Sequence, residues 1–168
     1  RRLTVPERIL FDGSVYKGVD EDAVRDCCRR LKKQNVESVA ISLIFSFVNP
    51  VHEKRVAEIV AQEMPGVQIS KSHEVLPRAP EYDRTSTTVV NAYVGPRVTS
   101  YLERLVSRLK ESGYGNQLMV MQASGGVASA AEVGRKPITT ALSGPAAGAL
   151  GSAVISEMAG FPNIVTLD

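Results

Sequence analysis

Apolar and polar positions in the first part of the chain predict two short strands followed by a helix. Residues 8–18, "RILFDGSVYKG", predict strands on either side of Asp12-Gly13, a dipeptide suited to a tight hairpin turn. A helix follows, because Asp20 can cap it, acidic residues occupy its first turn and basic residues its last. The predicted inner face of this helix consists of Val24, Cys27, Cys28 and Leu31.

The alternation of strands and helices continues in the next segments. Residues 36–48, "VESVAISLIFSFV", form a nearly continuous apolar run, which predicts a strand buried on both faces of a parallel sheet. Asn49-Pro50 predicts the start of a second helix, and residues 67–72, "VQISKS", alternate as a strand with one exposed face. Strands and amphipathic helices that alternate twice are typical of an α/β domain. The apolar side of the second helix holds Val56, Ile59, Val60 and Met64.

The second half of the chain begins with a long helical region. It starts at Pro80, and Gly95-Pro96 predicts a break or kink, because proline removes an internal hydrogen bond and crowds the preceding turn. Beyond it, residues 118–122 predict a strand, residues 123–126 a tight loop, residues 129–133 a short helix and residues 163–168 a last strand. The helix after Pro96 has one apolar stripe: Val98, Tyr101, Leu102, Leu105, Val106 and Leu109.

Composition narrows the class of protein. The chain has 168 residues, of which 43% are apolar and 23% charged, as in ordinary globular domains. Its 20 basic and 18 acidic side chains are dispersed, so a nucleic-acid partner has no electrostatic support. The longest apolar run is too short to span a membrane, which needs roughly 20 residues. The adjacent cysteines, Cys27 and Cys28, favour a reduced, cytoplasmic protein.

The stretch "ALSGPAAGALGSA", residues 141–153, predicts a helix of unusually small residues. With Ser143 or Gly144 as its cap and Pro145 in its first turn, one face is lined by glycine and serine. Leu150 and Val154 line a nearly opposite face. We expect a helix buried on both sides, whose bare face admits a second helix at short distance. Tight packing without any ligand is the alternative explanation.

This helix and the strand after it resemble part of a known ATPase superfamily. The segment "SGPAAGALGSAVISEMAGFPNIVTLD" is similar to the connecting helix and second phosphate-loop strand of the actin, hexokinase and heat-shock chaperone ATPases. The resemblance implies an α/β fold, specifically a partial actin-like (ribonuclease H-like) ATPase fold with a mixed or parallel sheet flanked by helices. It also implies that Asp168 serves Mg²⁺ bound with a nucleotide, a role that suits a carboxylate at a strand end.

A narrower resemblance covers nearly the whole chain. The segments "EYDRTSTTVVNAYVGP", "VMQASGG" and "LSGPAAG", in this order, are similar to the large subunit of the hydantoinase A and 5-oxoprolinase family. The resemblance implies that residues 1–78 complete an N-terminal lobe and that residues 79–168 begin the hydantoinase A core lobe. Because the glycine-rich phosphate loops of the family are missing, we expect an internal segment of a larger enzyme that binds no nucleotide by itself.

The resemblance further implies ATP-dependent opening of a cyclic amide, such as hydantoin or 5-oxoproline, through a phosphorylated carbonyl. It implies ATP and Mg²⁺ as cofactors of the full-length protein and a hydantoinase B-type subunit or domain as partner. A ketone carboxylase subunit and a non-catalytic scaffold of the same fold are the alternatives. No nucleophile or metal cluster in the sequence points to other chemistry, and His52 and His73 are too isolated to predict zinc.

Two groups of polar residues are candidates for binding. Residues at the predicted nucleotide cleft lie at a strand end or a helix start, where backbone donors favour anions. Residues early in the long helix either reach substrate or hydrogen-bond backbone at an interface. The nucleotide-cleft candidates are Ser124, Gly125, Gly126, Ser143 and Gly144, and the substrate or interface candidates are Arg84, Thr85, Ser86 and Asn91.

Overall fold

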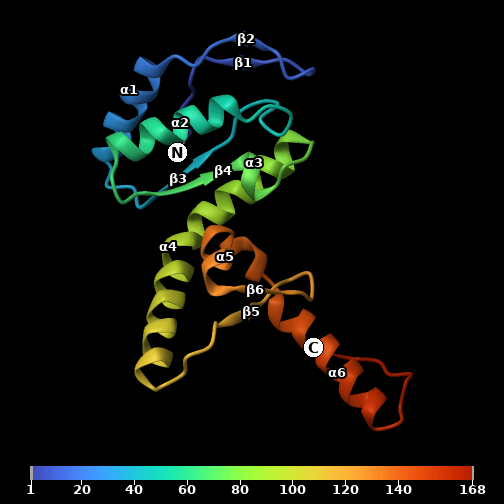
Figure 1. The fold of residues 1–168 in the computed structure, drawn as a ribbon. Helices are drawn as coiled ribbons and strands as arrows, with labels where there is room; N and C mark the ends of the chain where they lie inside the picture. The colour runs from blue at the N-terminus through green and yellow to red at the C-terminus, as the bar shows by residue number, and fades with distance from the viewer. Residues whose placement is uncertain (1, 168) are drawn as a thin grey trace. The chain divides into compact units, whose positions relative to one another are not determined.

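The computed structural model describes residues 2–167, which form two compact units divided between Pro96 and Arg97 (Figure 1). The long helix α4 contributes residues to both units, and the remaining elements belong to one unit each. The elements of the first unit are β1 Arg8–Ile9, β2 Val15–Lys17, α1 Glu21–Lys32, β3 Ser38–Ile41, α2 Val51–Glu63, β4 Gln68–Lys71, α3 Ser72–Val75 and the first half of α4 Glu81–Glu111.

Local signals explain the first elements. The β1–β2 hairpin is antiparallel, and Gly13 adopts a φ of 85°, which the tight turn requires. The Asp20 side chain accepts a hydrogen bond from the backbone N–H of Ala23 at 2.9 Å and caps α1. Both the predicted hairpin and the predicted first helix are confirmed.

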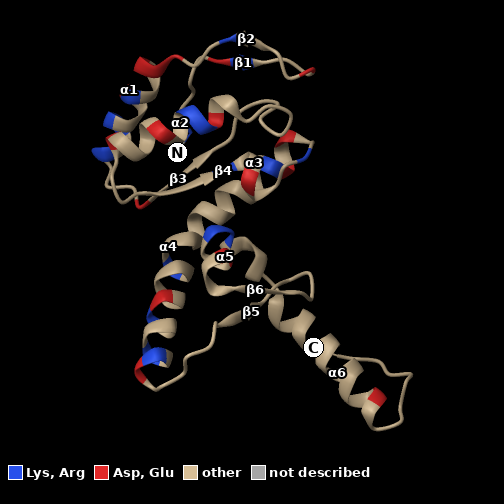
Figure 2. Cartoon of the chain, in the orientation of Figure 1, with Lys and Arg blue, Asp and Glu red and all other residues tan. Residues whose placement is uncertain are grey.

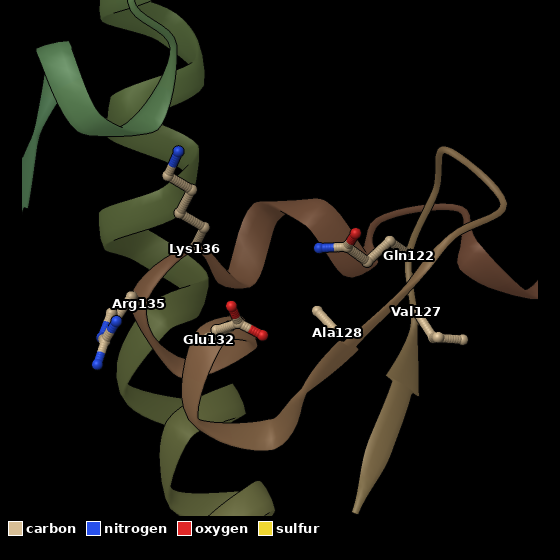
Figure 3. A pocket seen from close by; sticks show the side chains of 6 residues that line it. All are labelled: Gln122, Val127, Ala128, Glu132, Arg135 and Lys136. Atoms are coloured by element: carbon tan, nitrogen blue, oxygen red, sulfur yellow. The ribbon is translucent and has the colours of Figure 1, made fainter.

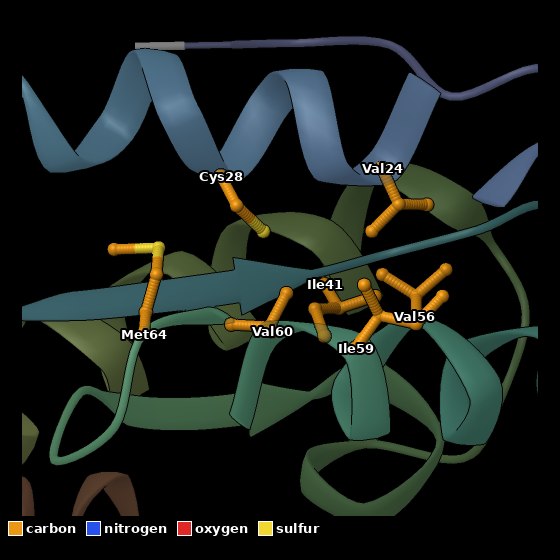
Figure 4. Close-up of a cluster of buried hydrophobic side chains, with 7 residues drawn as sticks. All are labelled: Val24, Cys28, Ile41, Val56, Ile59, Val60 and Met64. Atoms are coloured by element: carbon orange, nitrogen blue, oxygen red, sulfur yellow. The ribbon is translucent and has the colours of Figure 1, made fainter. Parts of the chain in front are cut away.

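The core of the first unit lies between the helices and a parallel pair of strands. Strands β3 and β4 pair in register from Ser38 opposite Gln68 to Ile41 opposite Lys71, with α2 as the crossover. Helices α1 and α2 pack against each other, and Figure 4 shows their apolar side chains meeting those of β3. The buried cluster comprises Val24, Cys28, Ile41, Val56, Ile59, Val60 and Met64.

The strand predicted over residues 36–48 is shorter than expected. Only residues 38–41 form a strand, and residues 44–48 turn, with Phe45 at a φ of 57°. The backbone N–H of Leu43 donates to Glu53 at 2.8 Å, and that of Phe45 donates to Glu81 at 3.3 Å. The run leaves the sheet because carboxylates from two helices take the N–H groups that a strand partner would otherwise receive.

The break predicted at Gly95-Pro96 does not occur, because α4 is helical from Glu81 to Glu111 and includes Pro96. Gly95 is buried, and a side chain there would meet the Gln68 amide at 2.6 Å, so β4 and α4 approach closely at this point. The position marks the boundary between the units and leaves the helix intact.

The second unit contains a hairpin, short helices and one long helix. Its elements after α4 are β5 Met119–Met121, β6 Val127–Ser129, α5 Ala130–Arg135, the 3₁₀ helix η1 Pro137–Thr140 and α6 Ser143–Met158. The sequence predicts a tight loop over residues 123–126 with a short helix after it. In the structure, these residues form the turn of an antiparallel hairpin, and the strand β6 comes before the helix. Gly125 has a φ of 83°, and the Gln122 N–H donates to the Gly126 carbonyl at 2.8 Å. These features close the hairpin and produce β6, which the apolar pattern alone does not reveal.

Helix α6 contradicts the expectation of burial on both sides. None of its residues is buried, and side chains added at Gly144, Gly148 or Gly151 would meet nothing within 4 Å. Its only charged residue is Glu157, and Figure 2 shows the contrast with the charged surfaces of α1 and α4. The expectation was wrong because, within residues 2–167, no second layer of side chains lies near the glycine face.

The last predicted strand is also absent over the described residues. Residues 163–167 have no strand partner and are exposed. Asp168, the predicted magnesium ligand, lies outside the described residues. Among residues 2–167, none of the helices combines the length and apolar character needed to cross a membrane.

Candidate functional site

A buried polar network lies at the carboxyl ends of β3 and β4, the edge where parallel sheets commonly bind ligands. Its centre is Glu53, in the first turn of α2, which is fully buried. One carboxylate oxygen accepts hydrogen bonds from the Leu43 N–H at 2.8 Å and the Ser72 hydroxyl at 2.6 Å. The other accepts from the His73 N–H at 3.0 Å and lies 2.7 Å from His73 Nδ1. These contacts satisfy a buried charge that would otherwise be strongly destabilising.

Arg84, a predicted substrate or interface residue, completes this network from α4. The residue is fully buried, and its Nε donates to the Ser72 hydroxyl at 3.0 Å. Its terminal nitrogens donate to the carbonyls of Leu43 at 2.9 Å and Arg78 at 3.2 Å, and it forms an ion pair with Glu81. The guanidinium therefore fixes the strand ends to α4, which corresponds to the backbone-binding alternative considered for it.

The other predicted residues on α4 are also held by the protein. The exposed Thr85 hydroxyl lies 2.7 Å from that of Ser42, at the end of β3. Ser86 donates to the backbone carbonyl of Tyr82 at 2.8 Å. Asn91 is buried and donates to the Ser70 hydroxyl at 2.9 Å. The structure thus gathers Arg84, Thr85 and Asn91 along the β3–β4 pair, and Thr85 is the one that faces solvent.

Sequence reasoning missed Glu53, Ser72 and His73. A signal existed, since Glu53 occupies the same helical face as the core residues Val56 and Val60, where a charge is unexpected. His73 Nε2 is buried and accepts or donates no hydrogen bond within residues 2–167, although a Glu74 oxygen lies 3.8 Å away. With its main groups buried and paired, the network can position the strand ends but offers no open surface for chemistry.

The nucleotide-cleft candidates lie in the second unit, in two neighbouring places. Ser124, Gly125 and Gly126 form the β5–β6 turn, and a Cβ on Gly125 would meet the Leu150 side chain of α6 at 2.9 Å. Ser143 and Gly144 open α6, whose N-cap position is Leu142, at a φ of 61° and with no side-chain cap. The first N–H groups of the helix therefore have no side-chain acceptor, which leaves them suited to an anion.

A shallow hollow of 440 Å³ lies between the β5–β6 hairpin and α5. In Figure 3, the Glu132 side chain lies between Lys136 and Arg135 on one side and Gln122 on the other. Hydrogen bonds from the Ser129 N–H and hydroxyl lower the pKa of Glu132, so its carboxylate stays ionised over the neutral range. Sequence reasoning did not single out this group, although Ser129 and Glu132 form a capping box at the start of α5, a spacing that the sequence displays.

Metal ligands are sparse in the part of the chain that the structure describes. No group of three or more His, Cys, Asp or Glu side chains is placed there to hold a metal ion. Asp168 lies outside the described residues, so its magnesium role stays a prediction.

Comparisons with known proteins agree with the motif analysis. The family model described as Hydantoinase/oxoprolinase matches residues 84–168, and the one for the Hydantoinase/oxoprolinase N-terminal region matches residues 1–64. The caprolactamase subunit alpha of Pseudomonas jessenii is 35% identical over 167 residues, which is 99% of this chain and 24% of that protein. The chain thus spans about a quarter of the length of this relative.

Two solved structures share the fold. The ATP-dependent caprolactamase from Pseudomonas jessenii has a TM-score of 0.80 and 34% identity over 93% of this chain and 23% of that one. Nucleotide-free acetone carboxylase has a TM-score of 0.80 and 31% identity over 93% of this chain and 22% of that one. These similarities confirm the α/β class and are consistent with the actin-like ATPase fold. The chain belongs to the hydantoinase/oxoprolinase family.

Proposed function

We propose that the full-length protein is the large subunit of an ATP-dependent hydrolase that opens a cyclic amide such as hydantoin or 5-oxoproline. The observation that carries this proposal is the continuous similarity of the chain, across both family regions, to the ATP-dependent caprolactamase. The names caprolactamase and oxoprolinase both refer to substrates whose ring contains an amide.

The proposed chemistry activates a poor electrophile. Transfer of the γ-phosphoryl group of ATP to the ring carbonyl oxygen makes the carbonyl carbon susceptible to water and leaves ADP. Such a reaction depends on positioned phosphates and electrostatic stabilisation more than on a strong protein nucleophile. Magnesium, when bound with ATP, would neutralise phosphate charge, with Asp168 as the ligand inferred from the family pattern.

The described residues would contribute in two ways. The uncapped start of α6, at Ser143 and Gly144, and the turn Ser124–Gly126 would offer backbone donors to the nucleotide. In the first unit, the Glu53 and Arg84 network would keep the β3–β4 edge rigid, with the Thr85 hydroxyl at its surface. The expected division into lobes at residues 78 and 79 stays part of this proposal.

A ketone carboxylase is the second candidate, favoured by the TM-score of 0.80 to acetone carboxylase. The two functions share ATP-dependent activation of a carbonyl and differ in what attacks or is added next. A scaffold without catalysis is the third possibility. The family resemblance implies that the glycines of the second phosphate loop follow directly after Asp168, and bulky residues there in the full-length protein would favour the scaffold.

An assay of ADP release by the purified full-length protein, together with its hydantoinase B-type partner, distinguishes these three candidate functions. ADP release is measured with hydantoin, 5-oxoproline or caprolactam, and separately with acetone or acetophenone in the presence and absence of bicarbonate. ADP release that requires a cyclic amide and ignores bicarbonate supports the hydrolase. Release that requires both a ketone and bicarbonate assigns a carboxylase, and no substrate-dependent release with either set contradicts the enzyme proposal.

A further inference from the structure

The C-terminal half of α4, residues 97–111 in the second unit, carries a row of arginines with a tyrosine among them. Arg97, Tyr101, Arg104 and Arg108 follow one another at intervals of four, three and four residues, which places their side chains on one side of the helix. The three arginines are exposed, and Tyr101 is 57% exposed. These four residues are called the arginine stripe below.

The guanidinium groups of the arginine stripe are not compensated by the described chain. Within residues 2–167, none of the three makes an ion pair or a side-chain hydrogen bond. Glu111, which follows Arg108 by three residues, accepts instead from the Ser107 hydroxyl at 3.0 Å. Arg104 and Arg108 are also one helical turn apart, a spacing at which like charges destabilise a helix. The arrangement is therefore unfavourable for α4 by itself.

Arginines on the helices of the first unit are arranged in the opposite way. Arg25 on α1 pairs with Glu21 at 3.0 Å and with Asp22 at 3.2 Å. Arg55 on α2 pairs with Glu58 at 2.9 Å. In each case an acidic partner lies three or four residues away on the same helix, so the charge is compensated locally. Because the arginine stripe has no such partners, its compensation must come from outside residues 2–167.

The residue types of the stripe suit contact with carboxylates of another protein. A guanidinium presents paired N–H donors that match the two oxygens of a carboxylate, and interfaces are enriched in arginine and tyrosine but depleted in lysine. A shallow hollow of 290 Å³ among Tyr101, Arg104, Leu105 and Arg108 lets an apolar side chain pack beside the charges. Nucleic acid fits less well, because this half of α4 carries charges of both signs (Figure 2) and its acidic residues would repel phosphates.

We propose that the arginine stripe is the surface on which a carboxylate-rich segment of the partner subunit docks. The three guanidinium groups pair with acidic side chains of that segment, and Tyr101 packs against its apolar atoms. The contact also relieves the repulsion between Arg104 and Arg108. The identity of the partner rests on the proposed function, whereas the surface and the sign of its charge rest on the contacts described above.

The test measures the Kd between the full-length protein and its hydantoinase B-type subunit by isothermal titration calorimetry, without ATP or substrate. The triple variant Arg97→Glu/Arg104→Glu/Arg108→Glu is expected to raise the Kd at least about tenfold, because three attractive contacts become repulsive. An increase of NaCl from about 50 mM to about 500 mM should weaken the wild-type complex several-fold and the variant complex less.

A matched control reverses three other cations at exposed positions. Arg30→Glu/Lys33→Glu/Lys54→Glu changes the net charge by the same amount on the first unit, and it should leave the Kd within about twofold.

A single variant separates docking from folding. Arg104→Glu places a glutamate four residues before Arg108, the favourable order for an ion pair on a helix. The melting temperature of the unbound protein should therefore stay equal or rise, while the Kd increases. A purely structural role of Arg104 would instead lower the melting temperature.

Each remaining outcome contradicts the docking surface. An unchanged Kd in the triple variant, or no complex between the wild-type proteins, overturns it. A lower melting temperature of the unbound triple variant assigns the stripe to another part of its own chain, and loss of self-association in sedimentation assigns it to a second copy. Because the Kd is measured without turnover, a failure of the ADP-release assay contradicts the hydrolase function and leaves the binding result standing.

Discussion

The two compact units of the chain differ in how completely each one buries its own elements. In the first unit, two helices and a parallel strand pair enclose an apolar cluster, and hydrogen bonds join the buried charged groups at the strand ends. In the second unit, burial is confined to a few positions such as Leu102, Val133 and Pro137, and α6 has no buried residue. The long helix α4 supplies residues to both.

This contrast separates the specificity of a motif from the stability of the segment that carries it. The stretch "SGPAAG" identifies the family strongly, yet the helix it begins has no buried residue, and its glycine face meets no other side chain within residues 2–167. The first unit also carries a family motif, residues 81–96, and in that unit buried side chains account for the fold. A family motif therefore identifies the family, but it does not show that its segment is buried in this chain. The stability of the segment within this chain depends on how much of it is buried.

The largest expected effect concerns the buried network. Glu53→Ala removes the acceptor of four contacts and leaves buried donors around Ser72 and His73 without a partner. We expect a loss of about 3–5 kcal/mol in the free energy of unfolding, measured by urea denaturation followed by circular dichroism. The control is Glu58→Ala, on the same helix, where the exposed carboxylate pairs with Arg55 and the loss should be within about 0.5 kcal/mol. Equal losses of unfolding free energy in the two variants would show that the buried network contributes no more stability than a surface ion pair.

Two isoleucines compare the units by the same substitution. Ile59 is 0% exposed in the core of the first unit, and Ile155 is 69% exposed on α6. Ile59→Ala should cost about 2–5 kcal/mol through lost burial and the cavity left behind, and Ile155→Ala within about 0.5 kcal/mol. Both are measured by denaturant unfolding of the chain. A large loss at Ile155 would mean that α6 is covered in solution, and the comparison between the units would fail.

Two helical glycines, one buried and one exposed, compare the units by adding a methyl group instead of removing side-chain atoms. Gly95→Ala places a methyl group 2.6 Å from the end of the Gln68 side chain, which must move, so the helix-propensity gain is offset and we expect a net change within about 0.5 kcal/mol. Gly148→Ala meets open space and should gain up to about 1 kcal/mol through helix propensity. Melting temperatures report both changes. Destabilisation by Gly148→Ala would restore the close-packed face that the sequence suggested.

The smallest expected effect concerns reactivity and not stability. Burial raises the pKa of the Cys28 thiol, which lowers the fraction of reactive thiolate at pH 8, whereas Cys27 is half-buried. In the native chain, N-ethylmaleimide should therefore modify Cys27 about tenfold faster than Cys28, as followed by peptide mass spectrometry. The difference should vanish in urea. Equal native rates would show that α1 does not stay packed on the core.

Features encoded by neighbouring residues could be predicted from the sequence. The Asp12-Gly13 hairpin, the Asp20 cap and the apolar face that includes Val56 and Ile59 are local patterns, and each appears where expected. The family was identified in the same way, because its motifs are continuous stretches of chain. Predictions that required a second segment were less successful, as the shortened strand after Ile41 and the open face of α6 demonstrate.

The sequence by itself determined the order of most elements, the caps and turns that delimit them, and the family to which the chain belongs. Only the tertiary structure decided where the polar groups pair, since Glu53 bonds residues 10, 19 and 20 positions away. The physical reason is the distance along the chain over which each interaction acts. Backbone dihedrals and capping depend on a few adjacent residues, whereas the burial of a charge or a bare helix face depends on side chains that distant segments bring to it.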